Sequence, residues 1–182
     1  MISDIPASNL REIGFDQRAQ FGGHLRPLSK PQFETAYRLE QAGTHAPATV
    51  VASGRRAPST RREDRVHERD DEGLIADLRL LNGTDSAVFG HPELLRLALP
   101  AIRGDYTAVE TYRCEPGRRI TAPIAVLTGD ADPKTTLAEA EAWRDHTEGA
   151  CTVRVFAGGH FFLTDHQADV TAEIAGHLDA VA

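Results

Sequence analysis

The fold of this chain is indicated most directly by residues 124–133, which read Ile-Ala-Val-Leu-Thr-Gly-Asp-Ala-Asp-Pro. The run 124–128, which is apolar except for Thr128, is typical of a short buried strand. The turn that follows it carries two carboxylates, Asp130 and Asp132, before Pro133 redirects the chain. In open α/β sheets, ligands and catalytic groups gather where the strands end. This turn is therefore a candidate site.

A second strand, residues 152–156, is followed by the loop 157–163, Ala-Gly-Gly-His-Phe-Phe-Leu. Its glycines let the backbone turn sharply, so that His160 can project over the strand ends. A carboxylate after one strand and a histidine after the next is the order in which α/β-hydrolases supply the last two members of a catalytic triad. There the imidazole takes the nucleophile's proton and the carboxylate fixes its tautomer. We predict these roles for His160 and Asp132, with Asp130 as the second choice; the alternative is two purely structural turns.

Strands and helices alternate on either side of these loops. The apolar segment 48–52 predicts a further strand, and helical spacing begins at Gln32 and again near Val170. Thr136 and Glu139 have the spacing of a capping box, which predicts a helix start. Strand–helix alternation without hairpin signals predicts an α/β fold, with a parallel sheet flanked by helices.

The middle of the chain interrupts this alternation, because residues 73–113 have the pattern of an all-helical block. Leucine spacing predicts one helix from Leu74, Pro92 suits the first turn of a second, and Pro100 is expected to begin a third. The preceding segment 55–72 carries six arginines and six acidic residues. We interpret this balanced run as a solvated linker or an exposed helix rather than a binding patch.

Composition limits the classes of function. The chain has 182 residues, 41% of them hydrophobic, and a formal net charge of −7. This predicts one globular domain and argues against nucleic-acid binding, which needs a positive surface. No apolar run approaches the roughly 20 residues that span a bilayer, and the first residues do not resemble a secretory signal. Two cysteines alone cannot form a four-ligand zinc site. We expect a cytoplasmic protein with no metal and no membrane partner.

Several longer blocks occur in a defined order. They are residues 53–58 (Ser-Gly-Arg-Arg-Ala-Pro), 81–84 (Leu-Asn-Gly-Thr), 92–95 (Pro-Glu-Leu-Leu), 129–133 and 158–163. From about Phe33 to the C-terminus the chain resembles the type II thioesterases of polyketide and nonribosomal peptide assembly lines, which are α/β-hydrolases.

The resemblance implies an α/β-hydrolase fold with a helical lid at about 62–118, and it puts Asp132 and His160 at the triad carboxylate and histidine. It also implies hydrolysis of acyl thioesters from the phosphopantetheine arm of acyl or peptidyl carrier proteins, without a metal or cofactor. In that reaction, misprimed or stalled units of antibiotic biosynthesis are cleared. Residues 33–182 would form a partial hydrolase domain, and residues 1–32 an irregular or poorly ordered segment.

The sequence departs from the family where the nucleophile is expected. The family has a Gly-His-Ser-Met-Gly elbow just before the helix that contains Phe33. Here residues 23–32 read Gly-His-Leu-Arg-Pro-Leu-Ser-Lys-Pro-Gln. Leu25 stands where the serine belongs, and the two prolines disfavour the elbow helix. Ser29 lacks the flanking glycines. The family's oxyanion loop and first strands have no counterpart in residues 1–22, so we expect a sheet that lacks its first strands.

Because the serine elbow is not intact, we expect very low or absent activity. Three explanations remain open: a truncated or frame-disrupted gene product, a natural pseudoenzyme, or a wrongly assigned start of the sequence. A second hypothesis is a non-catalytic module that docks an acidic carrier protein through Arg55, Arg56, Arg61 and Arg62. A third is an esterase that acts on oxygen esters. The leucines of the helical block either line a cavity for short acyl chains or, as we favour, pack the helices together.

Overall fold

A computed structural model describes residues 32–43, 47–81 and 92–180. Within them, one sheet is formed by β1 (Val50–Ser53), β2 (Ile124–Gly129) and β3 (Cys151–Phe156), in the order β1-β2-β3. Both pairings are parallel, as the alternating pattern predicted. The central strand β2 is buried at every position, which explains the apolar residues at 124–127. Residues 1–31, with the segment expected at the nucleophile elbow, lie outside the described part.

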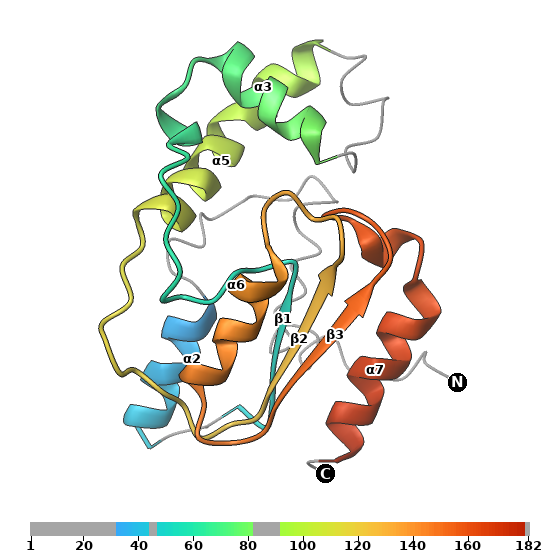
Figure 1. Cartoon of the computed structure of the whole chain (residues 1–182). Coiled ribbons are helices and arrows are strands. Elements are labelled where there is room, and N and C mark those ends of the chain that lie inside the picture. Colours follow the sequence, from blue (N-terminus) through green and yellow to red (C-terminus); the bar gives the residue numbers. More distant parts are fainter. Residues whose placement is uncertain (1–31, 44–46, 82–91, 181–182) are drawn as a thin grey trace.

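Helices cover the two faces of this sheet (Figure 1). One face carries α2 (Gln32–Gln41), α6 (Leu137–Glu141) and a 3₁₀ helix (Ala142–His146). The other face carries α7 (Gln167–Asp179), which follows a short 3₁₀ turn (Phe162–Thr164). Alternate residues of β2 face opposite ways: Ile124 and Val126 pack toward α2 and α6, whereas Ala125 and Leu127 pack toward α7. The predicted parallel sheet flanked by helices is confirmed.

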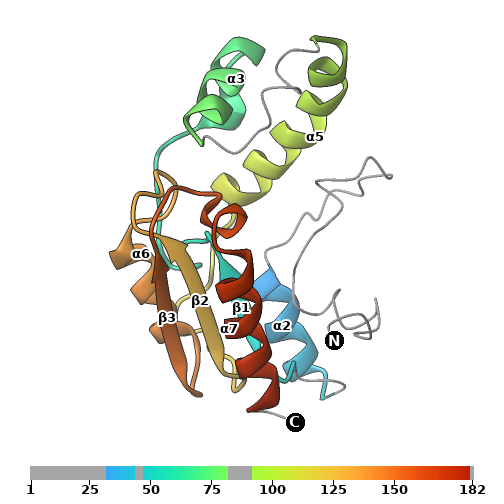
Figure 2. The ribbon, with the colours of Figure 1, turned by 90° about the vertical axis from the view of Figure 1, so that its right-hand side faces the viewer.

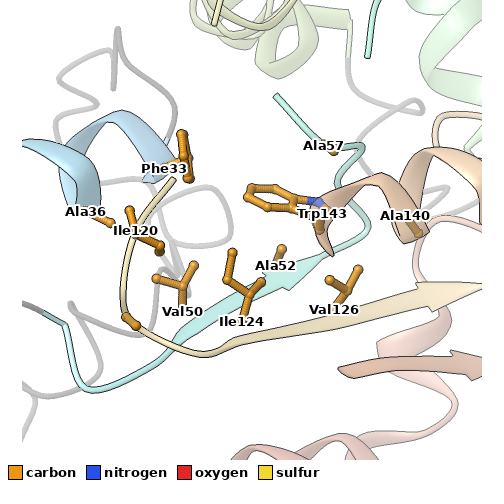
Figure 3. Close-up of a cluster of buried hydrophobic side chains, with 11 residues drawn as sticks. Phe33, Ala36, Val50, Ala52, Ala57, Ile120, Ile124, Val126, Ala140 and Trp143 are labelled. Atoms are coloured by element: carbon orange, nitrogen blue, oxygen red, sulfur yellow. The ribbon is translucent and has the colours of Figure 1, made fainter. Parts of the chain in front are cut away.

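The core on the α2 side is built around two aromatic rings (Figure 3). Phe33 of α2 packs edge-to-face on Trp143, with ring centroids 6.0 Å apart. The indole N–H of Trp143 donates to the backbone oxygen of Arg55 at 2.8 Å. Buried Trp usually finds such a partner. This contact fixes the chain just after β1, where it leaves the sheet toward the helical segment.

A separate helical layer lies beyond the carboxyl ends of the strands (Figures 1 and 2). It consists of a 3₁₀ turn (Val66–Glu68), α3 (Asp71–Leu80) and α5 (Pro92–Thr111). We call these three elements the helical layer. Its own buried cluster contains Val66, Leu74, Leu95 and Leu99. Leu74, Leu95 and Leu99 therefore pack the helices together, as favoured from the sequence.

Pro100 lies inside α5, so the prediction that it begins a separate helix is wrong. Proline has no N–H for the carbonyl four residues earlier, and it normally kinks or ends a helix. Here Leu95, Leu99 and Ile102 form one apolar face that continues across the proline into the same cluster. Burial of that face outweighs the lost hydrogen bond.

The charged connector, by which we mean residues 55–70 of the charged segment before α3, is less solvated than the sequence suggested. It is irregular apart from one 3₁₀ turn, but Val66 within that turn is only 1% exposed. The Glu110 carboxylate of α5 accepts from the backbone N–H groups of Val66 and His67, each at 3.0 Å. The connector is thus attached to α5. In the described ranges, no helix combines the length and apolarity that crossing a membrane would require.

Candidate active site

The loops after β2 and β3 are joined backbone to backbone. The N–H of Asp130 donates to the oxygen of Phe156, and the N–H of Ala131 donates to the oxygen of Gly158, both at 2.9 Å. The Asp130 carboxylate accepts from the Gly158 N–H at 2.9 Å. Asp130, the second choice for the acidic role, therefore has a structural role, because its carboxylate holds the two loops together.

Glycine is required where these loops meet. A Cβ atom on Gly129 would lie 2.3 Å from the oxygen of Gly159 and 2.4 Å from that of Gly158. Gly158 has φ +124°, a conformation that other residues rarely adopt. The Gly-Gly pair and Gly129 thus allow two backbones to touch, and this contact sets the distance between the two predicted site residues.

Asp132 and His160 are brought together. His160 Nδ1 lies 2.9 Å from Asp132 Oδ2. The other carboxylate oxygen, Oδ1, accepts from the Lys134 N–H at 2.7 Å. The Asp132 side chain is fully buried, whereas the His160 side chain is 26% exposed. A buried carboxylate held by two donors can orient an imidazole that is itself partly exposed.

The chain after β1 supplies a third wall of this site. Gly54 has φ +57°, and a Cβ atom there would lie 3.3 Å from His160 Cε1. The Gly54 N–H donates to the Leu127 oxygen at 2.8 Å, and the Thr135 hydroxyl donates to the Gly54 oxygen at 3.1 Å. The ends of all three described strands therefore converge on His160. Gly54 and Thr135 are site residues that were not predicted; the signal for Gly54 is its place just after the strand expected at 48–52.

An ion pair encloses the Asp132 loop from outside. The Arg62 guanidinium binds both carboxylate oxygens of Glu139, at 2.7 and 2.5 Å, and donates to the Pro133 oxygen at 2.7 Å. Burial alone would raise the pKa of Glu139, but hydrogen bonds from Arg62 and Thr136 outweigh it and lower the pKa to about 2. Glu139 also completes the predicted capping box with Thr136. Arg62 is thus occupied, which corrects the idea of four available arginines at 55–62.

The chemistry available is that of an imidazole and a carboxylate. In the described part of the chain, His160 Nε2 has no hydrogen-bond partner, so it can exchange a proton with a bound group. No group of three or more His, Cys, Asp or Glu residues that could hold a metal ion occurs in residues 32–43, 47–81 and 92–180. Ser29 and Leu25 lie outside the described residues.

Comparison with known proteins identifies the family of this chain. The thioesterase domain family matches residues 32–180 of the chain. The chain belongs to the thioesterase family. The domain is 60% identical over 146 residues to a probable cadicidin biosynthesis thioesterase of Streptomyces griseus, covering 80% of this chain and 40% of that protein. It is 44% identical over 161 residues to the thioesterase PikA5 of Streptomyces venezuelae, covering 88% and 57%.

A solved structure gives the same assignment of fold. The type II thioesterase BorB from the borrelidin biosynthetic cluster superposes with a TM-score of 0.72 at 50% identity, covering 80% of this chain and 60% of BorB. The α/β-hydrolase type of fold and the resemblance to type II thioesterases are thereby confirmed. The thioesterase domain here spans 40% and 57% of the lengths of the two curated relatives.

Proposed function

We propose that this thioesterase domain serves the hydrolysis of acyl thioesters carried on the phosphopantetheine arm of an acyl or peptidyl carrier protein in the cytoplasm. The observation that carries the proposal is the hydrogen bond from His160 Nδ1 to the buried Asp132, at the ends of three parallel strands. Membership of the thioesterase family supplies the substrate class.

In the proposed mechanism, His160 Nε2 takes the proton of a serine hydroxyl as the serine attacks the thioester carbonyl. Asp132 keeps the other ring proton on Nδ1 and stabilises the imidazolium. The thiol of the phosphopantetheine arm leaves with that proton. His160 then takes a proton from water as the water attacks the acyl-serine, and it returns that proton to the serine oxygen as the acid leaves.

The proposal includes a strong limit on the activity of this chain. The 182-residue sequence contains no Gly-x-Ser-x-Gly motif, and Leu25 stands at the family's serine position. Covalent catalysis needs the nucleophile in reach of the imidazole. We therefore expect turnover to be very low or absent unless another hydroxyl, such as that of Ser29, reaches His160.

The experiment that tests the function is hydrolysis of a short acyl-phosphopantetheine carrier thioester, followed by release of free thiol. The wild type is compared with His160→Ala and with His177→Ala, a control on α7 that pairs with Glu173. Turnover that His160→Ala abolishes and His177→Ala preserves supports the proposal, and Ser29→Ala then identifies or excludes that nucleophile. Wild-type turnover that survives in His160→Ala contradicts it.

Other outcomes of the same assay identify the alternatives. Faster cleavage of the matching oxygen ester indicates an esterase. Salt-sensitive binding of the carrier without any turnover indicates a docking module. Such a module would have to bind without Arg62, because the guanidinium of Arg62 is held by Glu139 at 2.5 Å.

A further inference from the structure

Lys134 connects the candidate site to the helical layer. Its backbone N–H donates to Asp132 Oδ1 at 2.7 Å, two residues away. Its side chain extends in the other direction, and Nζ lies 2.6 Å from Asp77 Oδ2 on α3. One residue therefore contacts both the carboxylate that binds His160 and a carboxylate of the helical layer.

Asp77 is a buried charge inside the layer. The residue is 5% exposed, and the Tyr106 hydroxyl of α5 donates to its Oδ2 at 2.6 Å. Burial, followed by the hydrogen bond to the Asp77 carboxylate, raises the pKa of Tyr106 well above its usual value. Arg69 lies farther away, at 3.9 Å from Oδ1. A buried carboxylate is costly without a cation in contact, so Lys134 is its main counter-charge.

The ammonium group of Lys134 is held on two sides. Besides Asp77, it lies 5.4 Å from the centroid of the Tyr106 ring, within the range of a cation–π contact. The Lys134 side chain is 20% exposed. Both partners belong to helices of the layer, α3 and α5, so the lysine is bound to the layer as a unit rather than to one helix.

We propose that Lys134 is a positioning residue that couples the helical layer to the Asp132–His160 pair. Contact with Asp77 holds the Lys134 peptide against Asp132. When the contact between Lys134 and Asp77 is broken, this restraint is lost and Asp132 orients His160 less well. The inference rests on the proposed function in treating this pair as the working part of the site.

The test is a spectroscopic one on the whole chain. The Nδ1–H proton of His160 is observed by NMR, and its exchange with water reports how firmly Asp132 holds it. Lys134→Met keeps the apolar stem and removes the charge, and we expect it to accelerate exchange of this proton at least tenfold. Lys134→Arg restores a cation at this position, and we expect its exchange rate to lie close to that of the wild type. Arg96→Met, which removes an exposed charge from α5, is the control and should leave exchange unchanged.

Backbone amide exchange in α3 and α5 separates coupling from simple attachment. If Lys134→Met speeds amide exchange in α3 and α5 but not exchange of the His160 Nδ1 proton, Lys134 only attaches the layer and the proposal is wrong. If neither exchange rate changes, the proposal is also wrong. Should Lys134→Met fail to fold, Asp77→Asn makes the same test, because it retains the volume and the Tyr106 contact. No substrate is used, so a negative hydrolysis assay does not affect this result.

Discussion

The backbone of Gly129 passes so close to Gly159 that a Cβ atom on Gly129 would lie 2.3 Å from the Gly159 carbonyl oxygen. In proteins, the distance from a Cβ atom to a non-bonded heavy atom is essentially never shorter than 3.0 Å. The opposing atom is backbone and cannot rotate away as a flexible side chain would. Any side chain at Gly129 must therefore separate the loop that carries Asp132 from the loop that carries His160.

We therefore predict that Gly129→Ala lowers the free energy of unfolding by about 1–3 kcal/mol, as overpacking does in other cores. It should also break the contact between the two site loops. The matched control is Gly176→Ala on α7, where an added Cβ meets no atom within 4 Å. Alanine favours helix there, so stability should rise by up to about 1 kcal/mol. Urea unfolding measures both, and equal effects of the two variants would contradict the steric argument.

The site could be predicted from the sequence because its two main residues follow strands that are easy to recognise. β2 is buried at all its positions, so residues 124–127 are all apolar, and parallel strands bring their carboxyl ends to one edge. The choice of Asp132 over Asp130 as the partner of His160 agrees with the hydrogen bond observed. Its catalytic role stays a prediction.

The long-range ion pairs could not be predicted. Arg62 and Glu139 are 77 positions apart, and the segment 55–72 offers many charges of both signs with no local rule for choosing partners. The same holds for Lys134 and Asp77. Pro100 misled for a different reason: local propensity indicates a helix boundary, whereas the buried face that carries α5 past it depends on α3.

Asp132→Asn should change the tautomer of His160, whereas Asp130→Asn should not. Oδ1 at position 132 accepts from the Lys134 N–H, so in the asparagine variant the amide oxygen stays there and the NH₂ group faces His160 Nδ1. The ring proton must then move to Nε2. At position 130 the amide oxygen can still accept from the Gly158 N–H. Nitrogen chemical shifts of the imidazole measure the tautomer.

The consequence for catalysis follows from that tautomer. With the proton on Nε2, the imidazole cannot accept a proton from a nucleophile, and in a known triad the same change lowers kcat by about 10⁴. Any measurable hydrolysis should therefore be lost in Asp132→Asn and largely kept in Asp130→Asn. A normal tautomer in Asp132→Asn would show that Asp132 does not control the ring.

Glu139→Gln should reduce stability more at neutral pH than at pH 3. The pKa of Glu139 is lowered from 4.5 to about 2, chiefly by Arg62 against the opposing effect of burial. A carboxyl with a lowered pKa in the folded state stabilises the protein above its ordinary pKa, and this contribution is lost as the pH falls toward 2. Glutamine keeps the capping box, so the variant isolates the ion pair. We expect a loss of about 1–2 kcal/mol at pH 7.

Urea unfolding at pH 7 and pH 3 measures this effect. The control is Glu141→Gln, whose partner Arg144 lies three residues away on the surface, with both side chains 51% exposed. Exposed pairs contribute little, so this variant should behave as the wild type at both pH values. A deficit in Glu139→Gln that is as large at pH 3 as at pH 7 would mean that lost packing, not lost charge, is responsible.

His146 should make the fold sensitive to mild acid. It is 4% exposed, and its ring packs edge-to-face on Phe33 with centroids 5.0 Å apart. Nδ1 lies 3.2 Å from the Arg118 carbonyl oxygen, and Nε2 accepts from the Ser59 N–H at 3.2 Å. The neutral ring with its proton on Nδ1 satisfies both contacts. Nε2 also lies 2.9 Å from the Ser59 hydroxyl oxygen. Burial lowers the pKa of His146 below its usual 6.5, because a charged ring is disfavoured in this core.

The direction of the pH effect follows from that lowered pKa. Below about pH 6.5 the unfolded chain binds a proton at His146 that the folded chain does not, so stability is full above this pH and falls as the pH decreases. One such proton contributes a slope of at most about 1.4 kcal/mol per pH unit. In His146→Gln the slope of the unfolding free energy between pH 7 and pH 5 should become smaller, although stability at pH 8 drops because the ring contact is lost. Equal slopes in the wild type and in His146→Gln would refute the assignment to His146.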